Sequence, residues 1–433
     1  MNVKTKKAKN QVNVKNSSIK VLSNEEISRR IEKIEKNLTA HTWRDLETNG
    51  KFEKNDKLTF ISDEMLIVGC DIGSEIHYVR AIDVRGRELS EEVFGFSNNE
   101  EGFESAKAWM LNLAANNDKE QIVLGLEPTG HYWFALTEWL VSKGISVVQV
   151  NPYAVKQSKE IEDNSQLKDD RKDPKIIANL VKDGNYGMPY IPEKLYADMR
   201  RLSMFRDQLT EDRIRNINRL HREMKIYFPE YMDAFGKIDG SFALEVLKVA
   251  PMPADIIAHG EDGLRDIWHN AKLRGRGYNR AKDIVSYAKT SVGLTDGTDA
   301  GREAVKWFSE QIIKLDEQLE KIESTLHKKC MEIPHAENLL KINGVGENIL
   351  AGILAEMGDI SRFDDVKEIQ KLSGMSLVAC SSGKHKGQTK ISHRGRKRLR
   401  YWLFQAAKSA VAHAEEFKQL HVYYTTRTSN PLK

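Results

Sequence analysis

The stretch "MLIVGCDIGSEIHYVRAIDV", residues 65–84, decides the fold. It begins with a short apolar run that stops at Asp71 and at turn residues, which is the pattern of a buried strand. "IHYVRAIDV", residues 76–84, then alternates between apolar and polar side chains, as a hairpin partner does. A third stretch of this kind reaches "VFGF", residues 93–96. The sequence therefore predicts three strands in succession.

Helices and strands alternate after this point. A helix is predicted through "EGFESAKAWMLNLA" (residues 101–114), a buried strand at "QIVLGLE" (121–127), a helix from His131 and a strand at "ISVVQV" (145–150). Three strands followed by alternating helices and strands is the order of a ribonuclease-H-like domain. We therefore expect an α/β RNase H-like domain over residues 61–192.

Length and composition limit the class of protein. A chain of 433 residues, 40% hydrophobic and 30% charged, is expected to form about two to four domains. No apolar run reaches the roughly 18 residues of a membrane span, and the lysine-rich N-terminus lacks the apolar segment of a signal peptide. The sequence therefore predicts a soluble, cytosolic protein that does not bind membranes.

The N-terminal residues and the cysteines point to no chemistry. Residues 1–60 are predicted to be a basic extension that carries one polar helix, near Glu25–Leu38. Cys70, Cys330 and Cys380 lie far apart without metal-ligand spacing, so we expect buried thiols.

Four carboxylates occupy positions where they are able to converge. Asp71 closes the first strand, and Glu127 ends the fourth strand, at the end of an open sheet where ligands tend to bind. Asp170 and Asp173, within "KDDRKDPKIIANLV" (residues 168–181), have i, i+3 spacing at the start of a helix and share one face. The alternative reading is strand caps and ordinary helix N-terminal charge. Four converging acids, however, are what a pair of magnesium ions requires.

The middle of the chain, residues 193–332, reads as helical. "LYADMRRLSMFRDQLTEDRIRNINRLHREMKIYF" (195–228) has apolar residues at helical spacing, and residues 231–302 read as a small helical insertion. A second helix carries a strict alternation of three- and four-residue steps, typical of coiled-coil packing: Val305, Phe308, Ile312, Leu315, Leu319, Ile322 and Leu326. Such a stripe predicts an antiparallel hairpin or a dimer seam.

The C-terminal region, residues 333–433, combines a glycine pair with a basic run. Gly344 and Gly346 lie between two apolar helical segments, as in a helix-hairpin-helix whose backbone N–H groups approach a DNA phosphate. Between Lys384 and Arg400 stand eight Lys or Arg and no acid. By composition alone this run is a nucleic-acid-binding patch with incidental serines. The residues expected to grip phosphate are Lys384, Lys386, Arg394 and Arg396.

A family resemblance joins these observations. "GCDIG" (69–73), "LEPTGHY" (126–132) and "KDDRKDP" (168–174) resemble the motifs of the DEDD insertion-sequence transposases, the family one-hundred-and-ten recombinases that work with a bridge RNA. Their N-terminal domain resembles the Holliday-junction resolvase RuvC. Asp169 and Pro174 stand where that family usually has a small polar residue and an alanine. The resemblance implies four metal acids: Asp71, Glu127, Asp170 and Asp173.

The same resemblance extends through residues 360–400 and implies a catalytic serine. It falls on Ser382, between Gly374 and Gly383, and not on its neighbour Ser381. The family implies a phosphoserine intermediate, about two Mg2+ ions, donor and target DNA, a structured guide RNA and a homo-oligomer, dimer or tetramer. The function expected from sequence is thus RNA-guided, site-specific DNA recombination.

Three alternatives stay open at the level of sequence. A metal-dependent junction nuclease would use water as the nucleophile, and a covalent protein–DNA adduct would exclude it. An actin-like or sugar-kinase-like ATPase is suggested by "DIGSE" (71–75), which resembles the first phosphate loop of that fold. No second phosphate loop follows, and a nucleotide-binding assay would test this alternative. A protein that only binds nucleic acid is the third.

Overall fold

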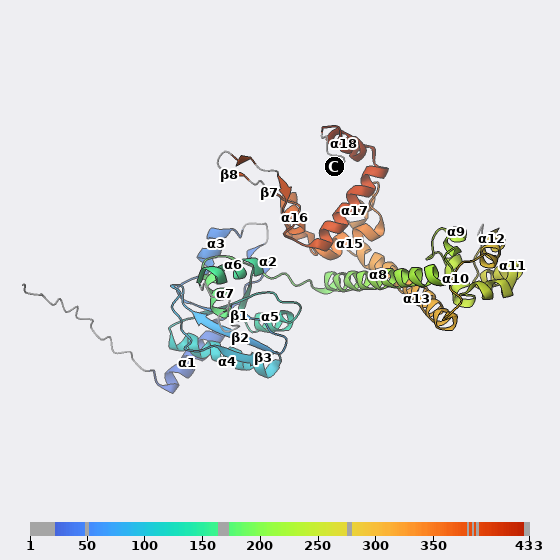
Figure 1. Cartoon of the computed structure of the whole chain (residues 1–433). Helices are drawn as coiled ribbons and strands as arrows, with labels where there is room; N and C mark the ends of the chain where they lie inside the picture. Colours follow the sequence, from blue (N-terminus) through green and yellow to red (C-terminus); the bar gives the residue numbers. More distant parts are fainter. Residues whose placement is uncertain are drawn as a thin grey trace, which may run out of the picture. The chain divides into compact units, whose positions relative to one another are not determined.

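The computed structural model describes residues 22–47, 52–162, 173–274, 279–378, 381–382, 385–386 and 389–427, with the backbone alone at 160–162, 381–382 and 385–386. The chain divides into two compact units, Met1–Ile191 and Pro192–Lys433, and each is described by itself (Figure 1). None of the helices in the described ranges is long and apolar enough to cross a membrane.

The first unit is built on a mixed, six-stranded sheet with the order β3-β2-β1-β4-β5-β6. β1, β2 and β3 are antiparallel, whereas β1, β4 and β5 are parallel and β6 returns antiparallel to β5. The strands are β1 (Met65–Asp71), β2 (Ile76–Ile82), β3 (Phe94–Ser97), β4 (Gln121–Leu126), β5 (Ser146–Val150) and β6 (Tyr186–Gly187). The helices are α1 (Asn24–Asn37), α2 (Trp43–Leu46), α3 (Lys54–Phe60), α4 (Glu100–Asn116), α5 (Trp133–Ser142), α6 (Pro152–Glu162) and α7 (Asp173–Lys182).

Alternate side chains of each central strand enter different cores, one on either face of the sheet. In β1, Leu66 and Val68 pack with α4 and α5, whereas Ile67 packs with α7 on the opposite face. β4 repeats the pattern, with Leu124 on the α4 face and Val123 on the α7 face. Because side chains alternate between the two faces along a strand, these assignments also determine the face on which every later residue of β1 and β4 lies.

Two glycines let α7 approach the sheet closely. Gly69 and Gly125 are register partners in β1 and β4. A Cβ on Gly69 would lie 1.8 Å from the carbonyl oxygen of Pro174, and a Cβ on Gly125 would lie 2.3 Å from a methyl group of Val181. Neither approach is compatible with a side chain larger than hydrogen. This glycine pair therefore seats α7 directly on β1 and β4.

Gly69→Ala should destabilise the first unit by roughly 1–3 kcal/mol or more, because the new methyl group meets the backbone of α7 rather than a mobile side chain. Urea unfolding monitored by circular dichroism would measure the decrease in stability. Gly187→Ala in β6 is the matched control, since its nearest neighbour would lie 3.9 Å away, at Glu47. Equal stability of the two variants would show that α7 is not seated by Gly69.

The residues before the first strand contribute to the core, unlike the extension predicted from composition. Ser23 caps α1 through a capping box with Glu26, and Ile34 on this helix is buried with the core around α4. Trp43 and Ile61 enter the core on the α7 face. Few apolar residues are enough to bury these helices, because each packs against a surface formed by other elements. The local sequence pattern does not show such a surface.

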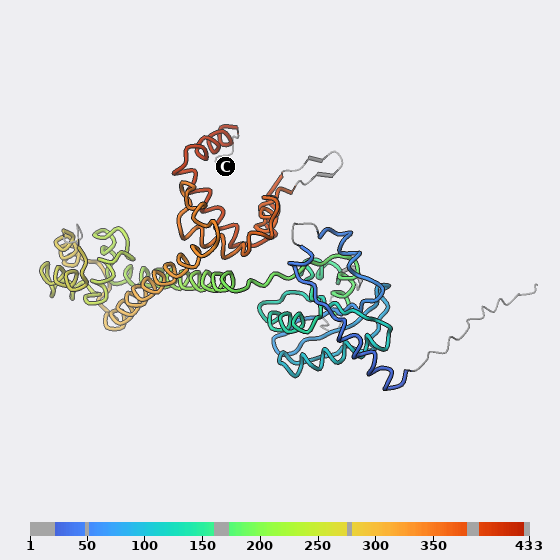
Figure 2. The backbone as a smooth tube through the Cα atoms, turned by 180° about the vertical axis from the view of Figure 1, so that it is seen from behind, coloured from blue at the N-terminus to red at the C-terminus, as the bar shows by residue number. Residues whose placement is uncertain are grey.

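The second unit contains two long helices, α8 (Lys194–Tyr227) and α13 (Thr298–Met331), which run side by side (Figure 2). Asp198 pairs with Lys329, and Tyr227 donates a hydrogen bond to the carbonyl of Gly297. The direction is therefore antiparallel. Val305 and Leu326 of the predicted stripe are buried within the chain, and the predicted antiparallel hairpin is confirmed.

Four helices follow α8, as predicted for a helical insertion: α9 (Tyr231–Phe235), α10 (Ser241–Val249), α11 (Pro253–Asn270) and α12 (Arg280–Lys289). They share one core with the adjoining ends of α8 and α13, in which Trp268, Tyr231 and Phe228 are fully buried. Tyr231 donates its hydroxyl to the carbonyl of Ala243 at 2.7 Å, so its polar group is satisfied. No chemistry is indicated in this cluster.

The C-terminal part is mainly helical. It contains α14 (Ala336–Leu340), α15 (Glu347–Met357), a 3-10 turn η2 (Ile360–Arg362), α16 (Val366–Ser373), β7 (Leu377–Val378), β8 (Ser381–Ser382), β9 (His385–Lys386), β10 (Lys390–Ile391), α17 (Lys397–His413) and α18 (Glu415–Thr425).

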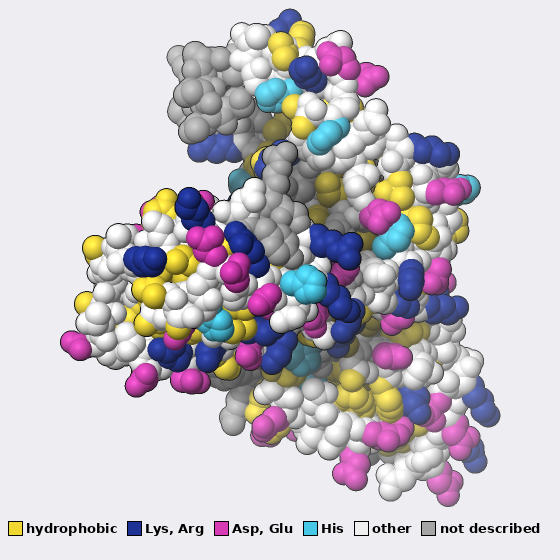
Figure 3. Space-filling model, turned by 90° about the vertical axis from the view of Figure 1, so that its right-hand side faces the viewer, with side chains coloured by type: hydrophobic (Ala, Val, Ile, Leu, Met, Phe, Trp, Pro, Cys, Tyr) yellow, Lys and Arg dark blue, Asp and Glu magenta, His cyan; other side chains and the backbone are white. Residues whose placement is uncertain are grey.

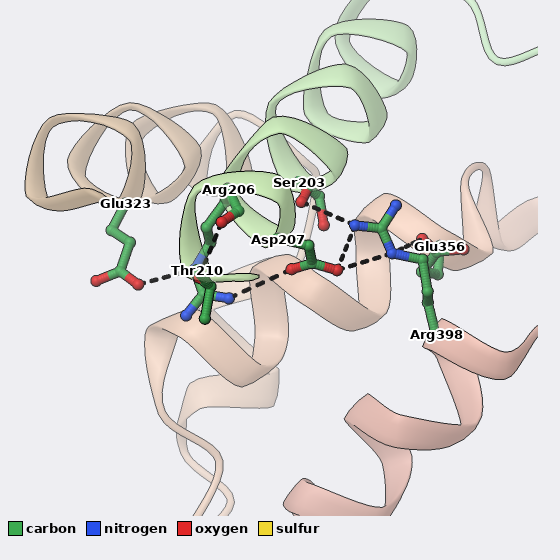
Figure 4. Close-up of polar contacts among 7 residues, drawn as sticks. All are labelled: Ser203, Arg206, Asp207, Thr210, Glu323, Glu356 and Arg398. Atoms are coloured by element: carbon green, nitrogen blue, oxygen red, sulfur yellow. Dashed lines mark hydrogen bonds and ion pairs between the residues drawn. The ribbon is translucent and has the colours of Figure 1, made fainter. Parts of the chain in front are cut away.

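A half-buried polar network joins this part to the long helices (Figure 4). Arg398 of α17 donates to Asp207 at 2.7 Å and to the carbonyl of Ser203 at 3.1 Å, both on α8. Arg206 donates to Glu323 of α13 at 2.7 Å. Glu356 of α15, which is buried, lies 3.7 Å from Arg398. Part of the basic run is thus used inside the fold.

Candidate active site

Asp71 and Glu127 lie side by side at the carboxyl ends of adjacent parallel strands. The register pairs Cys70 with Leu126, and each acid is the next residue along its strand direction. Gly69 and Gly125 lie two residues before these acids and face α7. Because side chains alternate between the two faces of a strand, both acids are on the α7 face of the sheet. The two acids that the sequence placed at strand ends are therefore neighbours.

The helix α7 brings a third carboxylate to the same place. It begins at Asp173, one residue before the Pro174 carbonyl that lies against Gly69, and the Asp173 side chain is only 13% exposed. Burial raises the pKa of Glu127, Lys159 opposes this rise, and the negative charges of Asp71 and Asp173 add to it. The charges of Asp71 and Asp173 thus both act on Glu127.

Asp170, the fourth predicted acid, and Asp169 lie outside the described residues. Within the described ranges, no three carboxylate, histidine or cysteine side chains are arranged to hold a metal ion as they stand. The donor chemistry nevertheless fits a hard divalent cation, because Glu127 is half-buried and the negative charges of Asp71 and Asp173 both act on it.

Lys159 is a feature of this site that the sequence reasoning missed. It lies on α6, and its ammonium group forms an ion pair with Asp173. Its charge also opposes the rise in the pKa of Glu127. One lysine on a polar helix carries no local signal, so only its position relative to the acids identifies it.

Ser382 lies in a short β-hairpin of the second unit. β7 pairs with β10, and β8 pairs with β9, so that Ser382 stands opposite His385 and Ser381 opposite Lys386. The side chains of these residues are outside the described part of the chain, as are Gly383 and Lys384 altogether.

The glycine pair has a different environment at each position. Gly344 has a φ of +93°, and a Cβ there would lie 2.6 Å from the carbonyl oxygen of Ser409 on α17. The close packing against α17 and the positive φ explain why this position requires glycine, and contact with a phosphate is not needed to explain it. Gly346 caps the N-terminus of α15, and in the described part of the chain no atom lies within 4 Å of a Cβ built on it, so this position is open there.

The two described arginines of the predicted phosphate grip also differ. Arg394 is exposed, whereas Arg396 is half-buried and donates to the carbonyl of Glu356 at the end of α15. Arg396 therefore helps to hold α15 against α17, which makes it a weaker candidate for contact with DNA. On the face in Figure 3, Lys and Arg are interspersed with Asp and Glu, in keeping with a formal net charge of only +4.

Comparison with known proteins gives both units the same assignment. A DEDD transposase family model of the IS110 type matches residues 68–229, which include the strand-end acids. A second model, described as "Transposase IS116/IS110/IS902 family", matches residues 336–422, which include the serine hairpin. The chain belongs to the IS110 family of transposases. It is a DNA transposase, and its substrate is therefore DNA.

Two relatives agree with this assignment. The transposase is 25% identical over 345 residues to the "Insertion element IS116 uncharacterized 44.8 kDa protein" of Streptomyces clavuligerus, covering 79% of this chain and 84% of the relative. It is 23% identical over 188 residues to "Putative transposase y4uE" of Sinorhizobium fredii, covering 43% of this chain and 51% of that protein. The DEDD type of domain also suggests dependence on a divalent metal. The family assignment replaces the ATPase and binding-only alternatives.

Proposed function

We propose that this transposase recombines DNA at sites chosen by a structured RNA, through a phosphoserine intermediate at Ser382 assisted by Mg2+. The metal-binding acids of the proposal are Asp71, Glu127, Asp170 and Asp173. The observation that carries it is the approach of three carboxylates from β1, β4 and α7 to one end of the sheet, within a family of DNA transposases.

The proposed metal chemistry follows from the charge of phosphoryl transfer. When bound, Mg2+ neutralises charge on the scissile phosphate and on the leaving oxygen. In this proposal the chain supplies carboxylates that would hold Mg2+ next to the scissile phosphate. Paired strands fix the backbone of Asp71 and Glu127, and a helix that backbone contacts seat on the sheet fixes the backbone of Asp173. Only side-chain movement is therefore needed for these acids to bind a cation.

The proposed role of Ser382 is that of the attacking group. Its hydroxyl loses its proton and its oxygen forms a bond to phosphorus. The bond from phosphorus to the 3′ oxygen breaks, and the 3′ oxygen takes up a proton, so that no proton is gained or lost overall. The exchange conserves one phosphoester bond, so the reverse attack by another 3′ oxygen rejoins the strands without an added energy source. Hydrolysis by water would not allow this, which is why recombination favours the serine over a nuclease mechanism.

The finer fold assignments are part of the same proposal. We assign the first unit to the RNase H-like, RuvC-like class, because its sheet order and its strand-end acids suit that fold. The α8–α13 hairpin is proposed as a coiled coil, and the turn from α14 to α15 as a helix-hairpin-helix in which Gly346, rather than Gly344, is open to phosphate. The domain ranges proposed are 61–192, 193–332 and 333–433, preceded by residues 1–60, whose described part packs into the first unit.

The proposed partners are donor and target DNA, a guide RNA and other copies of this chain in a dimer or tetramer. The guide is tested by purifying the full-length chain with its RNA, sequencing that RNA and searching for segments complementary to the DNA it recombines. Changing one such segment should stop recombination, and the compensating change in the DNA should restore it. Recombination by protein stripped of RNA would contradict RNA guidance.

The basic run yields a prediction about salt. Replacing Lys384, Lys386 and Arg394 with Gln should weaken DNA binding and reduce the slope of log affinity against log salt by about 0.9 for each phosphate that is no longer neutralised. Arg396 is left intact because its hydrogen bond to the Glu356 carbonyl supports the fold. Fluorescence anisotropy with a labelled duplex would measure the slope. As a control, Lys418→Gln on α18 should leave the slope unchanged; an equal slope in the triple variant would show that the basic run does not bind phosphate.

A further inference from the structure

We infer that Lys159 is a positioning residue of the acid site: it holds the carboxylates together in the absence of metal and is displaced from Asp173 when a divalent cation binds. This inference rests on the proposed function, because it takes Asp71, Glu127 and Asp173 as the metal-binding acids. It adds a role for a residue of α6 that no motif identifies.

The position of Lys159 supports this role. Its ammonium group pairs with Asp173, whose side chain is 13% exposed, while Lys159 itself remains 39% exposed. The same charge reaches Glu127, on which Asp71 and Asp173 act with the opposite sign. Lys159 therefore lies close to two carboxylates that come from other elements, Asp173 and Glu127.

The charge balance of the site supports the role independently. The negative charges of Asp71 and Asp173 both act on half-buried Glu127, and a nearby cation offsets that repulsion. A lysine ammonium group is a compact point charge on a flexible stem, so it is able to fill this role and to leave. Its partial exposure gives the side chain a path toward solvent, whereas Asp173 is fixed at the start of a seated helix.

The position of Lys159 and the charge balance of the site imply that Lys159 and a divalent cation compete for Asp173. A divalent cation bound to Asp173 and the ammonium group of Lys159 would compete for the same carboxylate, and their positive charges repel each other at that separation. The ion pair must therefore open for the cation to bind.

The test measures binding of Mn2+, a hard divalent probe, to the full-length chain by electron paramagnetic resonance of the free ion. Lys159→Met should bind Mn2+ more tightly than wild type, by on the order of tenfold, because one competing charge is removed. Lys159→Arg keeps the charge and should remain close to wild type. Lys156→Met is the matched control, since Lys156 is an exposed residue of the same helix.

A second measurement separates competition from a general loss of structure. Without metal, Lys159→Met should unfold at a lower temperature than wild type, and saturating Mn2+ should raise its melting temperature by more than it raises that of wild type. In an Asp173→Asn background, the added effect of Lys159→Met on Mn2+ affinity should largely disappear, because the competition acts through Asp173.

Two results would overturn the inference alone: equal Mn2+ affinity in wild type, Lys159→Met and Lys156→Met, or weaker Mn2+ binding by Lys159→Met. The second would show that Lys159 orients the acids for the cation rather than competing with it. Absence of saturable Mn2+ binding in every protein, wild type included, would end the metal part of the proposed function, and this inference with it.

Discussion

Ser382→Ala should form no covalent protein–DNA species on a nicked or suicide substrate, where the wild-type transposase should form one that survives boiling in detergent. The substitution removes the single oxygen that the proposal assigns as the attacking group, and no other atom of the side chain is able to replace it. A gel of labelled DNA after denaturation measures the species directly. The expected effect is complete loss of the adduct.

Ser381→Ala is the control for this experiment. It removes the same oxygen from the preceding residue of β8, which pairs with Lys386 rather than with His385. It should therefore keep most of the adduct, and both variants should be as stable as wild type because only one hydroxyl oxygen is removed. DNA cleavage by Ser382→Ala at the wild-type rate would establish water as the nucleophile, and the junction-nuclease alternative would then replace the recombinase mechanism.

Asp71→Asn and Glu127→Gln should each lower the rate of DNA strand cleavage by on the order of a thousandfold or more, since each removes a charge that supplies several kcal/mol of transition-state stabilisation through the metal. Both changes keep the shape of the side chain, so the paired strands that carry it should be undisturbed. Cleavage of a labelled duplex in Mg2+ measures the rate, and excess chelator should abolish cleavage by the wild type.

Glu91→Gln supplies the comparison for these two variants, because Glu91 is an exposed carboxylate of the same unit. It should cleave DNA at the wild-type rate. All three variants should bind DNA and RNA as wild type does, since the basic residues of the second unit are unchanged. Full activity of Asp71→Asn or Glu127→Gln in Mg2+ would end the metal hypothesis.

Local pattern predicted the strands of the first unit well. The run that ends at Asp71 is β1 (Met65–Asp71), and the stretch predicted at 145–150 is β5 (Ser146–Val150). An apolar run with turn residues after it allows few alternatives, because period and length are properties of a few neighbouring residues. The helix expected from His131 begins instead at Trp133. Element type followed from the sequence, while ends shifted by one or two residues.

Features that depend on contacts between distant segments could not be predicted from local sequence patterns. The helix α1 reads as polar, yet Ile34 is buried because α4 supplies the surface it fits. Arg396 reads as one of a row of cations, yet it bonds to the carbonyl of Glu356, 40 residues away in sequence. Gly344 reads as an approach point for phosphate, yet α17 lies against it.

The sequence by itself determined that Asp71 and Glu127 stand at the ends of buried strands, because hydrophobic period is a local signal. Only the tertiary structure decided that these acids are neighbours, since that depends on the parallel register in which Cys70 pairs with Leu126. The approach of Asp173 and Lys159 depends in turn on how closely α7 is seated on the sheet at Gly69. Register and seating are fixed by side chains far apart in the chain, and no window of neighbouring residues contains them.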